Sequence, residues 1–256
     1  MSNPFPLTIL TGSSRGMGEA MAAQYLQEGH CVIGISRRHS EALDALAASR
    51  GATLLQWRHD LAEPEAAGWA LLDWLQAQAP GRFSQATLLN NAGVIAPLQP
   101  LADIDPAATA KVLRVGLEAA MVMSTMFLRG TRGWMVPRKL LNISSGLGRR
   151  AMAGSASYCA AKAGMDHFSR ALAMEEALQP NGAKVVSLAP GVIDTGMQDQ
   201  LRAADPAAFP DHANFVALKA GGQLLSPADA AARVLAFLAR PDFGSNPVAD
   251  VRDTSA

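Results

Sequence analysis

The sequence has no excess charge of either sign. Lys plus Arg and Asp plus Glu number 22 each, and charged residues make up only 17% of the chain. A balanced chain has no overall field that would concentrate nucleic acid or an anionic membrane around it, so we expect neither partner. Any phosphate recognition must therefore be local. The low charge and the apolar content of 49% predict a chain that buries a large core.

Cysteine is also scarce, and long apolar runs are missing. Cys31 and Cys159 lie far apart with no CxxC spacing, so we predict neither a disulfide framework nor a metal site, and a reducing cytoplasm fits best. The apolar stretches are interrupted well before the roughly 18 to 20 residues needed to span a bilayer. The first residues contain no basic region followed by a long apolar stretch. We therefore expect no signal peptide and no membrane span.

Short apolar runs alternate with helical periodicity along the chain. The runs predicted as strands cover residues 7–10, 31–35, 53–57, 86–89, 139–143, 184–188 and 248–251. The segments predicted as helices cover 17–27, 41–48, 65–78, 107–128, 156–178 and 227–238. This alternation predicts an α/β fold with a doubly wound parallel sheet and helices on both faces. Because no linker or repeat interrupts it, we expect a single domain.

A glycine-rich turn connects the first predicted strand to the first predicted helix. It reads TGSSRGMG from Thr11 to Gly18, with glycines at 12, 16 and 18. Glycine lets the backbone turn tightly and approach a diphosphate, while the start of a helix offers unpaired N–H groups and a partial positive charge. The position of the turn between strand and helix therefore predicts a dinucleotide site.

Tyr158 and Lys162 stand four residues apart on a predicted helix, so their side chains leave the same face. A free tyrosine has a pKa of about 10, and a nearby ammonium or the positive charge of a cofactor favours the phenolate, moving that pKa toward neutral. A tyrosine with such a pKa exchanges a proton usefully. Taken alone, such a pair is more often an exposed helix face. Ser145 follows a predicted strand and stands thirteen residues before Tyr158.

These motifs together resemble the short-chain dehydrogenase/reductase family. The G-x-x-x-G-x-G turn, NNAG at residues 90–93 and Tyr158-x-x-x-Lys162 occur in the family's order over nearly the whole chain. The resemblance implies one NAD(P)-binding Rossmann-type domain over residues 1–256 and a catalytic set of Ser145, Tyr158 and Lys162. Ser145 would hold the substrate carbonyl, Tyr158 would supply the proton, and Lys162 would also hold the ribose hydroxyls. A small-molecule carbonyl substrate and a homodimer or homotetramer are likewise implied.

The resemblance also implies which residues bind the cofactor. They are Gly12, Ser14, Arg15, Gly16, Met17, Gly18, Arg37, Asp60, Leu61, Asn91, Ala92, Gly93, Tyr158, Lys162, Pro190, Gly191, Val192 and Thr195. Arg37 and Arg38 follow the second predicted strand, where an acidic residue would favour NADH and a basic one would accept a 2′-phosphate. Arg15 and Arg37 favour NADP(H) over NAD(H), whereas Arg38 is more readily interpreted as an ordinary solvated charge. The alternatives are ordinary solvated arginines, Asp60 as a helix N-cap, and a plain proline turn at Pro190.

Two further stretches, YCAAKAGMD and APGVIDTGMQ, resemble sepiapterin reductases and benzil reductases. This implies a carbonyl or vicinal dicarbonyl next to a ring, with substrate contacts from Ser145, Tyr158, Met197 and Asp250. Asp250 would anchor a pterin, with Asp253 as the fallback. A surface acid is the competing interpretation of Asp250. Residues 197–223 lie where the family carries a mobile substrate lid.

One position departs from the family pattern. Gly116 stands in the predicted helix 107–128 where the family usually has an asparagine that helps to hold a water for proton relay. A water or a backbone carbonyl could substitute, the helix could bend there, or the glycine could merely permit close packing. We therefore keep three hypotheses: an NADPH-dependent reductase of ketones or diketones, a sepiapterin reductase proper, and a catalytically weak cofactor-binding sensor.

Overall fold

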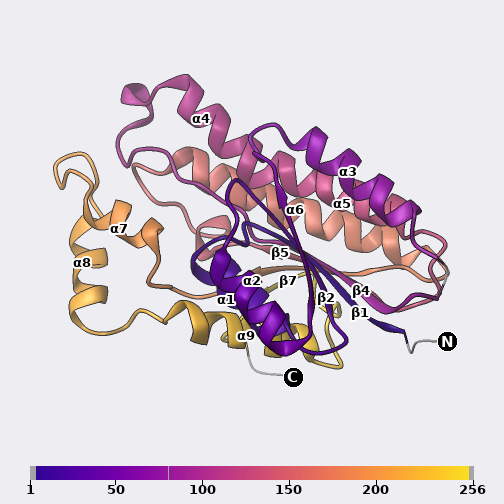
Figure 1. Ribbon diagram of the computed structural model, residues 1–256. Helices are drawn as coiled ribbons and strands as arrows, with labels where there is room; N and C mark the ends of the chain where they lie inside the picture. Colours follow the sequence, from indigo (N-terminus) through magenta and orange to yellow (C-terminus); the bar gives the residue numbers. More distant parts are fainter. Residues whose placement is uncertain (1–3, 80, 254–256) are drawn as a thin grey trace.

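A seven-stranded sheet runs through the centre of the protein in the order β3-β2-β1-β4-β5-β6-β7, and every neighbouring pair is parallel (Figure 1). The computed structural model describes residues 4–79 and 81–253. The strands are β1 (Phe5–Thr11), β2 (Cys31–Ser36), β3 (Thr53–Arg58), β4 (Phe83–Asn90), β5 (Arg138–Ile143), β6 (Lys184–Ala189) and β7 (Val248–Asp250). The predicted α/β fold with a doubly wound parallel sheet is confirmed.

Helices cover both faces of the sheet (Figure 1). One face carries α1 (Gly16–Tyr25), α2 (Glu41–Arg50) and α9 (Pro227–Ala239), and the other carries α3 (Pro64–Gln76), α4 (Pro106–Leu113), α5 (Ala119–Gly130) and α6 (Ala156–Ala177). Successive strand residues point to opposite faces, so Ile9 packs in the core under α3 and α5 while Leu10 packs under α1 and α9. Strands buried on both faces explain the continuous apolar runs in the sequence.

The helix predicted over 107–128 is not continuous. A π-helical turn, Arg114–Glu118, separates α4 from α5 and has Gly116 at its centre. One extra residue in the turn shifts the side chains that follow it, and such turns are frequent at functional sites. The interruption lies against α6, which carries Tyr158 and Lys162.

Two helices that the periodicity did not predict are α7 (Gly196–Arg202) and α8 (His212–Ala220), and both lie within or beside residues 197–223. They project beyond the carboxyl ends of the strands (Figure 1). No residue of α8 is fully buried, so its sequence has no strong apolar stripe to reveal a helix. Two short 3₁₀ turns, Leu101–Asp103 and Gly146–Gly148, complete the described elements.

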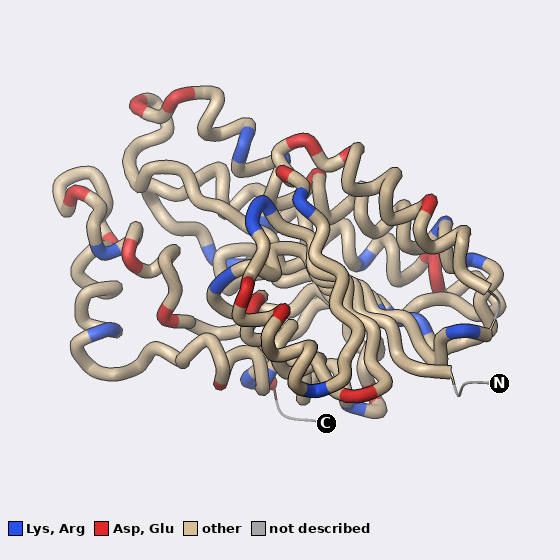
Figure 2. The backbone as a smooth tube through the Cα atoms, viewed as in Figure 1, with Lys and Arg blue, Asp and Glu red and all other residues tan. Residues whose placement is uncertain are grey.

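Charged residues of both signs are distributed over the helices and loops, as the balanced composition predicts (Figure 2). In the two described stretches, none of the helices combines the length and apolar character that a membrane crossing requires. Within the same residues, no three His, Cys, Asp or Glu side chains gather in a way that could hold a metal ion.

Candidate active site

The carboxyl ends of the strands open into a cleft of about 750 Å³. Strand order reverses between β1 and β4, and in doubly wound sheets this is where ligands bind. The cleft brings together the residues predicted to act in catalysis or to bind the cofactor or substrate, without the fallback Asp253: Gly12, Ser14, Arg15, Gly16, Met17, Gly18, Arg37, Asp60, Leu61, Asn91, Ala92, Gly93, Ser145, Tyr158, Lys162, Pro190, Gly191, Val192, Thr195, Met197 and Asp250. Parallel strands place these distant segments on one edge of the sheet.

The glycine-rich turn forms a cradle at the start of α1. Gly12 has φ +71°, a left-handed conformation that favours glycine. A Cβ on Gly18 would lie 2.0 Å from the carbonyl oxygen of Gly12, so only glycine lets the helix approach the turn so closely. No side chain caps the first turn of α1. A diphosphate fits this cradle, because it accepts hydrogen bonds from the N–H groups at a helix start.

Asn91 closes the turn from the neighbouring strand. Its side-chain Nδ2 donates to the backbone oxygens of Thr11 (3.0 Å) and Gly12 (3.2 Å). The backbone N–H groups of Asn91 and Ala92 both donate to the Thr11 hydroxyl, at 3.0 and 3.1 Å. The amide of Asn91 is thus occupied in holding the end of β4 against the turn after β1. It shapes the cofactor cleft through the backbone.

The arginines singled out for phosphate recognition lie at the cleft and are exposed. Arg15 immediately precedes α1, while Arg37 and Arg38 follow β2. The Ser36 hydroxyl donates to the carbonyl of Arg38 (2.6 Å), which shapes this turn. Among the described residues, neither Arg15 nor Arg37 forms an ion pair. Their guanidinium groups are therefore available to an anionic ligand.

Asp60 does not cap a helix. Helix α3 begins at Pro64 and its N-cap is Glu63, so the N-cap alternative for Asp60 is wrong. The Asp60 carboxylate instead accepts the backbone N–H of Ala62 (3.0 Å) in a tight turn. This turn buries the neighbouring Leu61, which lines the cleft.

Tyr158 and Lys162 lie one helical turn apart near the start of α6. The Lys162 Nζ lies 5.6 Å from the centre of the Tyr158 ring and donates to the backbone oxygen of Ile143 at the end of β5 (2.7 Å). A buried ammonium needs such partners, because an unpaired charge away from water is costly. The contact with Ile143 fixes Lys162 against the sheet.

Burial, and not the neighbouring ammonium, dominates the acidity of the tyrosine. It raises the pKa of Tyr158 to about 12, and the Ser145 hydroxyl opposes this rise. The predicted shift toward neutral is thus wrong for the cofactor-free protein, because desolvation disfavours the phenolate. Burial also lowers the pKa of Lys162 to about 8, and the nearby carboxylate of Asp166 opposes that fall. Tyr158 is therefore a protonated phenol at neutral pH.

The two serines after β5 have different surroundings. Ser145 begins the 3₁₀ turn Gly146–Gly148, and its hydroxyl accepts the N–H of Leu147 (3.1 Å) while lining the cleft. The Ser144 backbone N–H donates to the carbonyl of Leu188 on β6 (2.9 Å). Within the described residues, the buried Ser144 hydroxyl has no partner. Ser145 is thus the one whose hydroxyl oxygen is anchored and positioned beside Tyr158.

Gly116 combines two of the alternatives raised by its sequence. It lies in the π-helical turn, and a Cβ at this position would meet the Cβ of Ala161 at 3.3 Å. Ala161 stands between Tyr158 and Lys162 on α6.

Restoring the family's asparagine at position 116 should therefore push against α6. We expect Gly116→Asn to lower the free energy of unfolding by about 1 to 3 kcal/mol without raising turnover. Denaturant unfolding and steady-state kinetics check this, with Gly116→Ala as the smaller probe; an Asn variant of unchanged stability and higher turnover would contradict it.

An apolar wall borders the cleft near α7 and α8. Leu98, Met152, Leu201 and Phe209 form a buried cluster, against which Met197 and Phe215 also pack. The rings of Phe209 and Phe215 stack with their centres 5.7 Å apart. Neither Met152 nor Leu98 was singled out in the sequence, because loops have no periodicity that would reveal an inward-facing side chain.

Asp250 lines the cleft at the end of β7, but its carboxylate is already occupied. Arg252 donates to both of its oxygens, from Nε to Oδ1 and from NH2 to Oδ2, each at 2.7 Å. The Arg252 guanidinium holds the pKa of the Asp250 carboxyl below its usual range. Asp253 accepts the backbone N–H of Asp250 (2.7 Å) and supports the strand end. A ligand that binds the Asp250 oxygens must therefore share them with Arg252 or displace it.

The sheet order, the glycine-rich cradle at the strand ends and the Ser145, Tyr158 and Lys162 set are those of a nicotinamide-dependent oxidoreductase. Residues 7–206 match the family model of short chain dehydrogenases. The chain belongs to the short-chain dehydrogenase/reductase family, which confirms the resemblance seen in its motifs. Members of this family bind nicotinamide cofactors and interconvert carbonyl and hydroxyl groups.

Individual relatives agree with this assignment. The chain is 34% identical to a benzil reductase ((S)-benzoin forming) of Bacillus cereus, over 92% of this chain and 94% of the relative. It is 30% identical to the Bacillus subtilis (strain 168) benzil reductase ((S)-benzoin forming), over 91% and 93%. A Beutenbergia cavernae structure, assigned as an NAD(P)-dependent gluconate 5-dehydrogenase and holding NADP at low occupancy, is 28% identical with a TM-score of 0.79, over 98% and 96%.

Proposed function

We propose that the protein is an NADPH-dependent carbonyl reductase that acts on ketones or vicinal diketones of the benzil type. The observation that carries this proposal is the convergence of Ser145, Tyr158 and Lys162 on a cleft with free arginines and an apolar wall. The likeness to benzil reductases supports the diketone class. The same convergence argues against a mere sensor, which needs no proton donor.

The cradle after β1 would hold the cofactor diphosphate, and Lys162 would hold the ribose hydroxyls. Arg15 and Arg37 would bind the 2′-phosphate, since each lines the cleft and offers a fork of N–H donors that no carboxylate of the described residues occupies. Pro190, Gly191, Val192 and Thr195 follow β6 and would border the nicotinamide. When bound, NADPH supplies the hydride for the carbonyl carbon.

The proton chemistry follows from the three catalytic side chains. Ser145 would donate a hydrogen bond to the substrate carbonyl oxygen and so orient it beside Tyr158. Tyr158 would then give its phenolic proton to that oxygen as negative charge develops. The Lys162 ammonium, 5.6 Å from the ring centre, would stabilise the phenolate left behind. A protonated Tyr158 at neutral pH suits the reducing direction.

The pairing of Asp250 with Arg252 favours a diketone over a pterin. A diketone presents oxygen acceptors, which the donors of Arg252 could meet without leaving Asp250. A pterin ring presents N–H donors, and these would compete with Arg252 for the Asp250 oxygens. Met197 and Phe215, with the buried Phe209 packed behind Phe215, would enclose an aromatic substrate, with residues 197–223 as its lid.

An assay with NADPH and either benzil or sepiapterin tests this function. We expect turnover of benzil, and in the variant Asp250→Asn we expect the benzil KM to change less than about twofold, because no benzil group needs that carboxylate. If the pterin also binds, its KM should rise by about tenfold in the variant, the cost of a lost charged hydrogen bond. NADPH binding without turnover of either substrate would instead indicate the sensor function.

We further propose that the protein assembles as a homodimer or homotetramer in the cytoplasm. The implied interface consists of the α4–α5 segment and α6, and large apolar side chains are exposed on these helices: Leu113, Met121 and Met174. Two free thiols, Cys31 and Cys159, fit a reducing compartment.

A further inference from the structure

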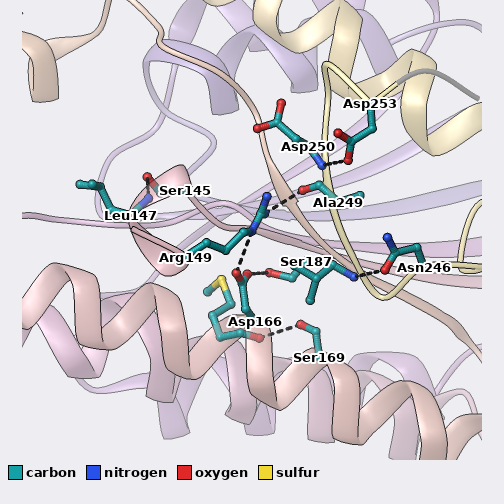
Figure 3. Close-up of polar contacts among 12 residues, drawn as sticks. Ser145, Leu147, Arg149, Asp166, Ser169, Ser187, Asn246, Ala249, Asp250 and Asp253 are labelled. Atoms are coloured by element: carbon teal, nitrogen blue, oxygen red, sulfur yellow. Dashed lines mark hydrogen bonds and ion pairs between the residues drawn. The ribbon is translucent and has the colours of Figure 1, made fainter. Parts of the chain in front are cut away.

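A buried carboxylate lies one helical turn beyond the catalytic lysine. Asp166 is only 2% exposed, on the same face of α6 as Lys162. The Ser187 hydroxyl on β6 donates to its Oδ1 (2.6 Å), and the Arg149 Nε donates to its Oδ2 (3.2 Å) (Figure 3). A buried carboxylate with two donors is held in one orientation, because losing the Arg149 guanidinium would leave its charge unpaired and losing the Ser187 hydroxyl would leave one oxygen without a donor.

Arg149 connects three separate segments of the active site. It follows Ser145 by four residues, directly after the 3₁₀ turn. Besides binding Asp166 on α6, it donates from NH2 to the backbone oxygen of Ala249 on β7 (2.8 Å), next to Asp250 (Figure 3). A single guanidinium therefore links the Ser145 segment, the catalytic helix and the strand that carries Asp250.

The Ser145 segment also packs directly on this part of α6. A Cβ on Gly148 would lie 2.9 Å from both the Asp166 Oδ2 and the backbone oxygen of Lys162. The segment therefore rests on the helical turn between Lys162 and Asp166. A substitution at Asp166 would therefore alter the position of Ser145 through Gly148 and Arg149, although Asp166 itself does not contact the substrate.

Asp166 is also an opposing charge for Lys162. Its carboxylate raises the pKa of Lys162 against the burial that lowers it. The other groups around Lys162 are Tyr158 on α6 and the Ile143 carbonyl on β5, while Arg149 contacts Asp166 from the other side. On β7, the Arg149 guanidinium helps to lower the pKa of the Asp250 carboxyl. Charged side chains on the adjoining α4 and π turn are exposed to solvent: Lys111, Arg114 and Glu118.

We propose that Asp166, held by Arg149, is a positioning residue that keeps Lys162 protonated and holds the Ser145 segment in register with Tyr158. The proposal rests on the reductase function above. Asp166 does not touch the substrate; it acts through Lys162 and through Arg149.

The first test is the pH dependence of kcat/KM for benzil reduction. Lys162, whose pKa lies at about 8, should give the wild-type enzyme an alkaline limb near that pH. Asp166→Asn keeps the shape but removes the charge, so the limb should move down by about one pH unit. Arg149→Gln should lower kcat/KM about tenfold without moving the limb down, since removing a cation does not disfavour the Lys162 ammonium. Ser187→Ala is the matched control, because it removes only the neutral partner and should leave the limb in place.

The second test needs no activity. Unfolding is measured for the cofactor-free wild type, Asp166→Asn, Lys162→Met and the double variant, at pH 7 and pH 10. At pH 7 the coupling between the two positions should amount to about tenfold in the folding equilibrium constant, equivalent to one pKa unit. At pH 10 the coupling should largely vanish, because Lys162 has lost its charge.

The outcomes separate this proposal from the proposed function. A wild type that turns over no carbonyl compound contradicts the reductase function, whereas the unfolding cycle still tests Asp166. An active wild type whose alkaline limb is unmoved in Asp166→Asn overturns the positioning role. Equal coupling at the two pH values also overturns it. If Asp166→Asn does not fold, the limb of Arg149→Gln decides, because a downward shift there contradicts the assigned charges.

Discussion

Replacing Tyr158 with phenylalanine is expected to lower kcat for carbonyl reduction by about 10² to 10⁴-fold, the usual contribution of a positioned general acid. The substitution removes the phenolic proton but keeps the ring that Lys162 faces from 5.6 Å. Lys162 retains its bond to Ile143, so the cofactor cleft should keep its shape. The Kd for NADPH, measured by fluorescence, should change by no more than about threefold, which is less than about 1 kcal/mol of binding free energy.

The second tyrosine provides a matched control for this variant. The chain has only two tyrosines, Tyr25 and Tyr158. Tyr25 lies on α1 and packs against His30, outside the cleft. Tyr25→Phe should therefore leave turnover close to wild type. Near-normal turnover in Tyr158→Phe would remove this residue from the mechanism.

Replacing the cleft arginines is expected to change which cofactor is used. Arg37→Ala and Arg15→Ala should each raise the KM for NADPH by about 10 to 100-fold, which corresponds to a lost hydrogen bond to a charged group. The KM for NADH should hardly change, because NADH lacks the 2′-phosphate. The ratio of kcat/KM values for the two cofactors is the measurement, and it should fall toward one or below.

Arg38 gives the control for the cofactor prediction. It neighbours Arg37 on the same turn and is equally exposed, but its backbone carbonyl is bound by Ser36 and we assign it no phosphate contact. Arg38→Ala should change the KM for NADPH by less than about threefold, as a solvated surface charge does. A wild-type enzyme with higher efficiency for NADH than for NADPH would contradict the roles of Arg15 and Arg37.

Much of the fold and the cleft could be predicted because their signals are local. Alternating apolar runs and helical periodicity predict parallel strands between helices, and a glycine turn between strand and helix predicts a cradle. The i, i+4 spacing of Tyr158 and Lys162 predicts a shared helix face. Parallel strands end at one edge of the sheet, so the predicted site residues that follow different strands were expected to meet there. They line one cleft, although Gly12 and Asp250 lie near opposite ends of the chain.

Other features depended on contacts between distant residues. The helix around Gly116 is interrupted where α6 packs on it, and α8 has too few buried residues for periodicity to reveal it. Burial raised the pKa of Tyr158, whereas the sequence showed only its charged neighbour. Asp166 had a possible signal in its spacing of four residues from Lys162, but nothing in that spacing shows burial.

The sequence alone determined the fold class and predicted the catalytic side chains, because backbone periodicity and helical spacing are properties of neighbouring residues. Only the tertiary structure decided the state of the charges. Arg149 reaches Ala249 across 100 positions of the chain and binds Asp166 on the catalytic helix. Arg252 likewise donates hydrogen bonds to both carboxylate oxygens of Asp250, and both residues line the cleft. Desolvation and pairing depend on what surrounds a group in space, and folding alone supplies those surroundings.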